Sequence, residues 1–189
     1  MSCAAIVIGG SAGALPVLET LLSALPADFA LPILIVEHLH ASDEGGFARH
    51  LAQVSTLPVI EPCDKAPIQG GRIYIAPANY HMLVERDRTI SLSVSEKVNW
   101  SRPSIDVLFE SAACVWCNAL VAVVLSGASV DGARGLGAVK AAGGRTLVQD
   151  PASAEIPFMP RAAIDAGVAD EVLPPVHIAR RLIEFGNQT

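Results

Sequence analysis

Continuous apolar runs of strand length alternate along this chain with segments of helical period. Residues 4–8, 32–36 and 119–125 show no alternation of polar and apolar positions, which is typical of strands covered on both faces. Segments with helical spacing lie between such runs, for example residues 15–25 and 131–142. The pattern predicts an α/β fold with a three-layer, doubly wound and mostly parallel sheet.

The middle of the chain departs from this pattern. Residues 72–76, 81–86 and 89–94 are short runs separated by Pro, Asn and Asp, which predicts a small antiparallel β-hairpin insertion. With 189 residues, 51% of them apolar, the chain can bury a sizeable core. We expect residues 1–189 to form a single domain. The remaining expected helices span residues 44–54, 103–116 and 175–185, and the remaining strands span residues 58–61, 145–148 and 170–173.

Charge and cysteine usage exclude several function classes. The net charge is −6, and no Lys or Arg precedes Arg49, so we expect no nucleic-acid partner. No stretch approaches the ~20 uninterrupted apolar residues of a transmembrane helix, so we expect a cytoplasmic chain without membrane insertion. Its four cysteines are expected to be free thiols, and Cys114 and Cys117 to pack on an apolar helix. A redox or metal site at this C-x-x-C is the alternative, although a second pair at metal-ligand spacing is missing.

Chemistry-bearing residues follow three of the predicted buried strands. The first strand runs into a Gly-rich loop that contains Ser11, the second into His38, and the strand at 119–125 into a loop that contains Asp131. Ligands of such sheets bind at the carboxyl ends of the strands, so the three side chains can converge. A serine hydroxyl needs a base, imidazole serves as one near neutral pH, and a carboxylate orients the imidazole. The sequence therefore predicts a site for nucleophilic catalysis.

Each of these signals is weak alone. Gly9-x-Ser11-x-Gly13 matches a nucleophile elbow, but Gly-rich loops after a first strand are common. His38 can be an ordinary polar residue at a strand end, and Asp131 a helix N-cap. Their combination on separate strand ends is informative. The chain order Ser, His, Asp differs from that of the α/β-hydrolase fold, which we therefore do not expect.

The chain resembles the catalytic domain of the chemotaxis receptor methylesterases, the CheB family. The resemblance covers nearly the whole chain, from about residue 5 to residue 183. The family motif G-A-S-T-G-G corresponds to residues 9–14, Q-H-M-P to 37–40, A-P-x-x-x-H-M to 76–82, R-P-S-x-D-x-L-F to 102–109, G-M-G-x-D-G to 127–132 and M-P-R-x-A to 159–163.

The resemblance implies a serine hydrolase with Ser11, His38 and Asp131 as its triad, and with no metal and no organic cofactor. The implied reaction is hydrolysis of glutamate γ-methyl esters on the cytoplasmic helices of methylated chemoreceptors, which releases methanol; deamidation of receptor glutamines is a related family activity. Backbone amides at Ala12, Gly13 and Ala128 are the implied oxyanion and pocket groups. A receiver domain or another chemotaxis protein acting in trans is a further implied partner, which would link the chain to a phosphorelay in signal transduction.

The chain departs from the family pattern at several positions near the nucleophile. Ala12 replaces a threonine, Ala14 a glycine, Ala128 a methionine and His40 a proline. The triad is intact, so we expect activity. The resemblance begins at the first strand, so we expect no N-terminal receiver domain and no gating by its phosphorylation.

Two other functions fit parts of the sequence. A nucleotide-binding domain would use the Gly-rich loop, with Glu37 as a ribose-binding acid, but G-x-G-x-x-G and G-K-[ST] are missing. A non-catalytic receptor-binding homologue would account for the alanine substitutions. Among the other residues, His81 and Met82 are expected to be structural, Trp100 is a candidate for the rim of the site, and Arg102 and Asp106 form either a surface ion pair or a substrate contact.

Overall fold

The computed structural model describes residues 3–187. Its strands are β1 (Ala5–Gly10), β2 (Ile33–Glu37), β3 (Val59–Ile60), β4 (Ile73–Ile75), β5 (His81–Val84), β6 (Ile90–Ser93), β7 (Leu120–Val124), β8 (Arg145–Gln149) and β9 (Glu171–Leu173). Its helices are α1 (Leu15–Ala24), α2 (Gly46–Val54), α3 (Ile105–Trp116), α4 (Ala133–Ala141), α5 (Phe158–Asp165) and α6 (Pro175–Gly186), with 3-10 turns η1 (Cys117–Ala119) and η2 (Pro151–Ser153).

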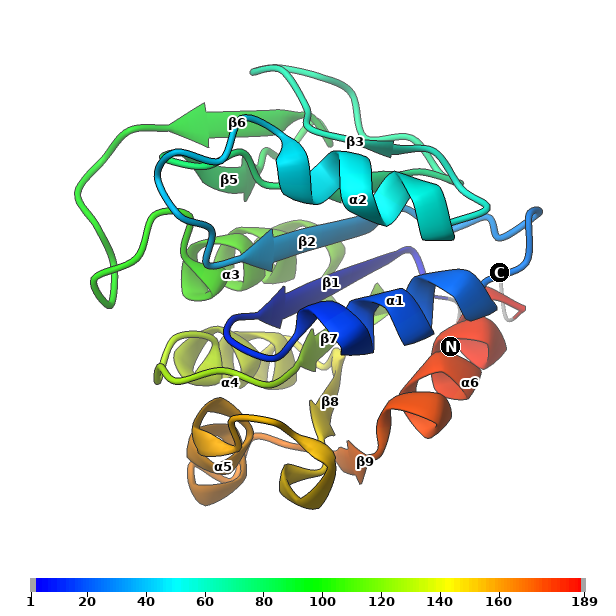
Figure 1. Ribbon diagram of the computed structural model, residues 1–189, viewed down its shortest axis with the longest axis vertical. Coiled ribbons are helices and arrows are strands. Elements are labelled where there is room, and N and C mark those ends of the chain that lie inside the picture. The colour runs from blue at the N-terminus through cyan, green and yellow to red at the C-terminus, as the bar shows by residue number, and fades with distance from the viewer. Residues whose placement is uncertain (1–2, 188–189) are drawn as a thin grey trace.

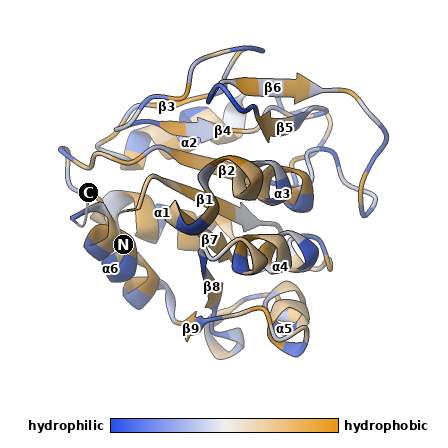
Figure 2. Cartoon of the chain, turned by 180° about the vertical axis from the view of Figure 1, so that it is seen from behind, coloured by the Kyte–Doolittle hydropathy of each residue, from blue (hydrophilic) through white to orange (hydrophobic). Residues whose placement is uncertain are grey.

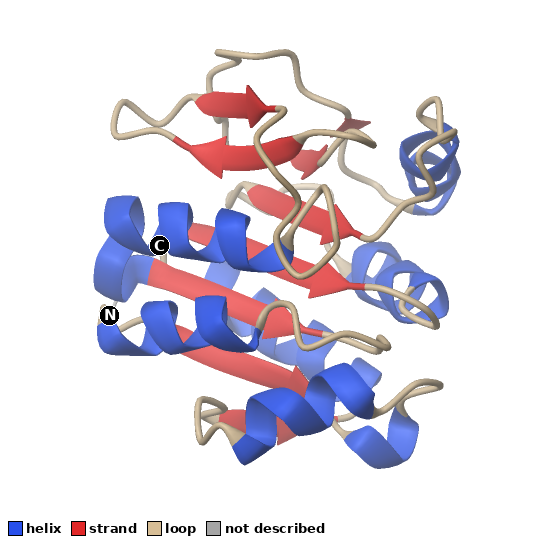
Figure 3. Cartoon of the chain, turned by 90° about the vertical axis from the view of Figure 1, so that its left-hand side faces the viewer, coloured by secondary structure: helices blue, strands red, loops and turns tan. Residues whose placement is uncertain are grey.

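Seven strands of the described chain form one sheet in the order β3-β4-β2-β1-β7-β8-β9. Every neighbouring pair in it is parallel, and Ile6 of β1 lies opposite both Ile33 of β2 and Val121 of β7. The arrows of the central strands therefore point the same way in Figure 3. Because β1 connects to β2 on one side and is flanked by β7 on the other, the strand order reverses at β1. A crevice for ligands forms at such a reversal point.

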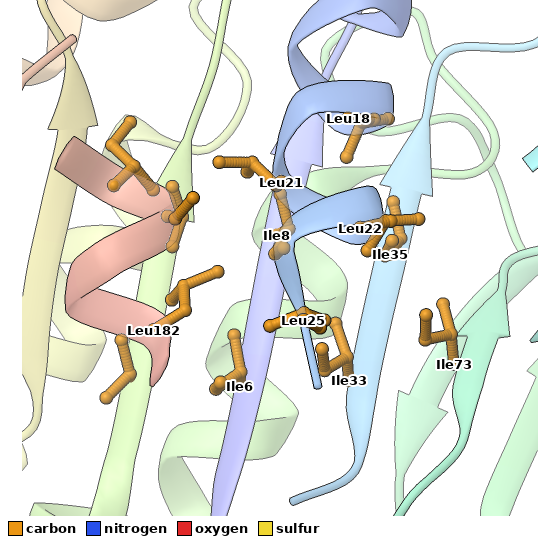
Figure 4. Close-up of a cluster of buried hydrophobic side chains, with 14 of the residues drawn as sticks. Ile6, Ile8, Leu18, Leu21, Leu22, Leu25, Ile33, Ile35, Ile73 and Leu182 are labelled. Carbon is orange, nitrogen blue, oxygen red and sulfur yellow. The ribbon is translucent and has the colours of Figure 1, made fainter. Parts of the chain in front are cut away.

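Helices cover both faces of the sheet, which confirms the predicted three-layer, doubly wound α/β fold (Figure 1). Ile6 and Ile8 of β1 belong to the same buried cluster as Leu18, Leu21 and Leu22 of α1, the helix that covers this face of the sheet (Figure 4). The alternate side chains of the same strands point to the other face, where they pack with residues of α3, α4 and α5. Both faces are thus buried, which explains why the strand sequences lack alternation. Figure 2 shows the central strands as largely hydrophobic.

One strand assignment from the sequence was wrong. The run at 72–76 was expected in the antiparallel insertion, but β4 lies in the main sheet, parallel to both β2 and β3. The three residues of β4 are all buried, as an internal strand requires. The antiparallel pair consists of β5 and β6 alone among the described strands, and Met82, Val84 and Ile90 pack it against α3.

Two helix starts also differ from expectation in a way that shapes the site. Helix α3 begins at Ile105, and α4 begins at Ala133 after Gly132, whose φ of 97° is left-handed. Residues 131 and 132 therefore belong to the loop after β7 instead of the first turn of a helix. Cys114 and Cys117 are exposed free thiols, which corrects the expectation that they pack against the helix. Within residues 3–187 no helix is both long enough and apolar enough to span a membrane.

Candidate active site

Ser11 lies just past the end of the central strand, at the reversal point of the sheet. Its backbone amide donates to the Ser126 carbonyl (2.9 Å), and its own carbonyl accepts from the Ala14 amide (2.9 Å). The loop after β7 passes very close: a Cβ added at Gly127 would lie 2.9 Å from the Ser11 Cβ and 2.6 Å from Met159. Glycine is required there because any side chain would push the loop away from the serine.

His38 follows β2, the strand beside β1. Its backbone amide donates to the Gly10 carbonyl (3.3 Å), which fixes the loop next to the serine. Its Nε2 lies 2.8 Å from Oδ2 of Asp131, and the two side chains are 12% and 0% exposed. The structure thus pairs the imidazole and the carboxylate that the sequence singled out. With Nε2 engaged, Nδ1 is the ring nitrogen left for a reacting proton.

The Asp131 carboxylate is held by many donors. Oδ2 accepts from His38 Nε2 (2.8 Å) and the Ile105 amide (2.7 Å), and Oδ1 accepts from Ser104 Oγ (2.8 Å), Asn99 Nδ2 (2.9 Å) and the Asp106 amide (3.2 Å). Two of these donors are amides at the N-terminus of α3, so Asp131 caps that helix and not the helix that follows it in sequence. Burial opposes ionisation of Asp131, but the hydrogen bonds from His38, Asn99, Ile105 and Ser104 outweigh it and lower its pKa.

A second buried carboxylate, Asp106, lies beside the first. Its Oδ1 accepts from the amides of Gly132 (2.9 Å) and Gly135 (2.7 Å) at the start of α4. Asp131 therefore caps α3, the helix that contains Asp106, and Asp106 caps α4, the helix that follows Asp131. Burial is the main cause that raises the pKa of Asp106, and the negative charge of Asp131 adds to the increase.

The expected ion pair between Arg102 and Asp106 does not form. The Arg102 guanidinium donates to the carbonyls of Val94 (2.7 Å) and Ser95 (2.9 Å). The cation near Asp106 is Arg134, at 3.6 Å. Sequence spacing placed Arg102 and Asp106 one turn apart, but α3 begins only at Ile105, so Arg102 lies outside the helix.

Ser11 and His38 line one open pocket of about 430 Å³. Ala128 contributes to its wall, and Trp100, which is 90% exposed, stands at its mouth together with Phe158. The rim position proposed for Trp100 is therefore confirmed. Ala12 and Gly13, the other predicted pocket residues, follow Ser11 in the loop but do not belong to this pocket lining. Within residues 3–187 no group of three or more His, Cys, Asp or Glu side chains is arranged to hold a metal ion.

Glu37, adjacent to His38, is buried away from the pocket. It is 7% exposed, its Oε2 lacks a hydrogen-bond partner within the described structure, and it lies against Gly10. Burial raises the pKa of Glu37 well above its usual range. Glu37 is absent from the lining of the pocket that contains Ser11, so it lends no support to the nucleotide-binding alternative.

His81 and Met82 are fully buried, in line with the structural role expected for them. The His81 Nδ1 accepts from the Ser104 amide (3.2 Å), and its Nε2 donates to the Glu96 carbonyl (3.0 Å). His81 therefore fastens the loop before α3. Sequence reasoning missed Asn99 and Ser104 as ligands of Asp131. Ser104 directly precedes α3, and Asn99 lies in a polar loop. Neither position in the sequence indicates contact with a distant carboxylate.

The fold and the pocket define the class of protein: a doubly wound α/β protein that presents a hydroxyl, an imidazole and a buried carboxylate from three adjacent strand ends. Comparison with known proteins gives the family. The model of the CheB methylesterase family matches residues 6–182, and the chain belongs to that family.

Individual relatives agree with this. A protein of Leptospira interrogans is 47% identical over 185 residues, which cover 98% of this chain and 96% of the relative. Relatives from Symbiobacterium thermophilum and Bordetella parapertussis, named protein-glutamate methylesterase/protein-glutamine glutaminase, are 36% and 40% identical over 92% and 94% of this chain, but only 48% and 52% of their own lengths. The crystal structure of the Thermotoga maritima CheB methylesterase catalytic domain matches with a TM-score of 0.92 and 33% identity, covering 97% of this chain and 99% of that one.

Proposed function

We propose that this chain is a serine hydrolase that removes methyl groups from glutamate γ-methyl esters of chemoreceptors and releases methanol. The observation that carries the proposal is the His38–Asp131 pair in the wall of the pocket that also contains Ser11, in a chain of the CheB methylesterase family. The names of two relatives, protein-glutamate methylesterase/protein-glutamine glutaminase, support the choice of substrate bond.

In the first half of the proposed reaction, Ser11 Oγ attacks the carbonyl carbon of the ester. The Nε2–H of His38 is donated to Asp131, so the lone pair of Nδ1 accepts the serine proton. The negative charge of Asp131 stabilises the imidazolium that forms. The carbonyl oxygen gains negative charge, and backbone amides around Ala12, Gly13 and Ala128 are the groups we propose to stabilise it.

In the second half, the imidazolium returns its proton to the leaving methoxy oxygen, and methanol departs from an acyl-enzyme on Ser11. Water then attacks the acyl carbon while His38 takes a proton from it, and the serine leaves with that proton. The products are a free glutamate carboxylate and the unchanged enzyme. The same steps convert a glutamine side chain, with ammonia as the leaving group, so deamidation is the second proposed activity.

The test is methanol release from a methylated chemoreceptor or a peptide that contains glutamate γ-methyl ester. We expect release with the unaltered chain and none above background with Ser11→Ala. Ser23→Ala, a change on the exposed side of α1, is the matched control and should retain full activity. Undiminished release by Ser11→Ala would refute the proposal, as would no release by the unaltered chain from any methylated receptor of its own organism.

A further inference from the structure

Asn99 occupies a strained two-residue turn at the edge of the pocket. The flanking residues, Val98 and Ser101, exchange backbone hydrogen bonds of 3.1 and 2.9 Å. Asn99 and Trp100 have φ angles of 50° and 62°, the left-handed pattern of a type I′ turn. Asparagine tolerates this conformation well, whereas tryptophan rarely adopts it. The turn places the Trp100 side chain in solvent at the pocket mouth and brings the Asn99 side chain to the buried carboxylates.

The Asn99 side chain joins the two buried aspartates. Its Nδ2 lies 2.9 Å from Oδ2 of Asp106 and 2.9 Å from Oδ1 of Asp131. A primary amide nitrogen carries two hydrogens, so one is available for each carboxylate. Asp106 and Asp131 are 2% and 0% exposed. A single neutral group from a third segment of chain therefore bridges two like charges that the fold holds side by side.

The other charged groups around this bridge do not replace it. On the Asp131 side the facing group is His38, which is the base itself. On the Asp106 side it is Arg134 of α4, whose side chain is 63% exposed and lies closer to Glu110 of α3 (2.7 Å) than to Asp106 (3.6 Å). Exposed guanidinium groups interact weakly with a buried charge because water screens them. Asn99 is the donor that both carboxylates share.

We propose that Asn99 is a positioning residue of the hydrolytic site, which keeps the Asp131 carboxylate ionised and aimed at His38 next to a second buried carboxylate. This inference rests on the proposed function. Asn99 also lines the pocket, but the role assigned to it is an effect on proton transfer through its hydrogen bond to Asp131. Without the Asn99 side chain, the Asp131 carboxylate accepts one hydrogen bond fewer. Its negative charge is then less neutralised, so it stabilises the protonated His38 ring more strongly.

The first variant is Asn99→Gly, which removes the amide and leaves a residue that adopts a positive φ without strain. Arg88→Gly is the matched control: Arg88 is an exposed residue with φ 63° in the turn between β5 and β6, outside the pocket. Activity is measured as methanol release per serine titrated with a fluorophosphonate, so that unfolded protein does not count. We expect Asn99→Gly to lower kcat by about 10- to 100-fold with KM little changed, since hydrogen bonds to charged groups have about this effect.

The pH dependence of kcat/KM distinguishes a positioning role of Asn99 from a role in the stability of the fold. We expect the acid limb of kcat/KM to move up by about half a pH unit in Asn99→Gly. The double variant Asn99→Gly, Asp106→Asn removes the neighbouring charge and should return the acid limb to its original position. If Asn99→Gly does not fold, Asn99→Ser, which donates to only one carboxylate, is measured in its place, with a smaller loss of kcat expected.

Unaltered kcat in Asn99→Gly, or a loss of kcat with an acid limb that does not move, would overturn this role for Asn99. Both outcomes leave the proposed function intact, because the unaltered chain is still active and titratable on its serine. If the unaltered chain neither reacts with fluorophosphonate nor releases methanol, the proposed function itself fails, and the two failures are distinguished.

Discussion

Replacement of Asp131 by asparagine tests the site at its most densely bonded residue. The change keeps the volume of the side chain but turns one acceptor oxygen into an NH2 donor. If the NH2 replaces Oδ2, it faces His38 Nε2 and the Ile105 amide. If it replaces Oδ1, it faces the donors Asn99 Nδ2, Ser104 Oγ and the Asp106 amide. In either orientation at least one buried backbone N–H at the start of α3 loses its acceptor.

The expected loss of stability follows from the number of buried donors that lose their acceptor. One buried unsatisfied donor costs about 1–3 kcal/mol in the free energy of unfolding, and for a chain of this size each kcal/mol lowers Tm by about 2–4 °C. We expect Asp131→Asn to lower Tm by roughly 2–12 °C. The catalytic effect is larger: an NH2 facing Nε2 favours the tautomer with its hydrogen on Nδ1, which does not accept the serine proton. The equivalent change in another serine hydrolase lowers kcat by about 10⁴-fold.

The assays are thermal unfolding and methanol release, with Asp165→Asn, an exposed site on α5, as the control that changes neither. The pKa of Asp131 is lowered in the folded protein, so its stabilising effect is present above its unfolded pKa and is lost as the pH falls through its folded pKa. The Tm difference between the two forms should therefore shrink in acid. A variant with unchanged Tm and activity at neutral pH would refute the geometry from which these effects are derived.

Two further substitutions test Glu37, which adjoins His38, and Trp100 at the pocket mouth. Glu37→Gln should stabilise the fold. Burial raises the pKa of Glu37, so the unaltered protein loses stability as the pH rises above the ordinary pKa of 4.5. The gain in unfolding free energy from the substitution should therefore grow with pH, up to about 1–3 kcal/mol. Chemical denaturation at several pH values measures this, and a gain that is equal in acid and base would contradict it. Trp100→Ala should raise KM by about 5- to 30-fold with little change in kcat, because the exposed ring offers apolar surface at the pocket mouth. Steady-state kinetics measures both constants, and a loss confined to kcat would contradict a role of Trp100 in substrate binding.

The sequence predicted the sheet and the three site loops because their signals are local. A buried parallel strand is a continuous apolar run, and a polar residue directly after it lies at the carboxyl edge, so Ser11, His38 and Asp131 were found from their positions alone. The resemblance to the CheB family then fixed which of these loops belong together. The structure places the imidazole and the carboxylate in contact, as this reasoning required.

The parts that the sequence did not predict depend on contacts between distant segments. The apolar run of β4 is short and fits either a hairpin or an internal strand, and only burial on both faces decides for the main sheet. Asp106 was paired with Arg102 by helical spacing, whereas its partners include the backbone amides of Gly132 and Gly135 at the start of α4 and the side-chain amide of Asn99. Asn99 reaches Asp131 from 32 positions away, through a turn whose positive φ angles leave no mark in a sequence without glycine at that site.

The most direct measurement of the central claim is the site of covalent modification by a fluorophosphonate, located by mass spectrometry of the digested protein. We expect a single stoichiometric adduct on Ser11. It should form far more slowly in His38→Gln and remain fast in His177→Gln, which changes an exposed histidine on α6. An adduct on a different residue, or labelling of Ser11 at the same rate without His38, would contradict the claim that these side chains work together.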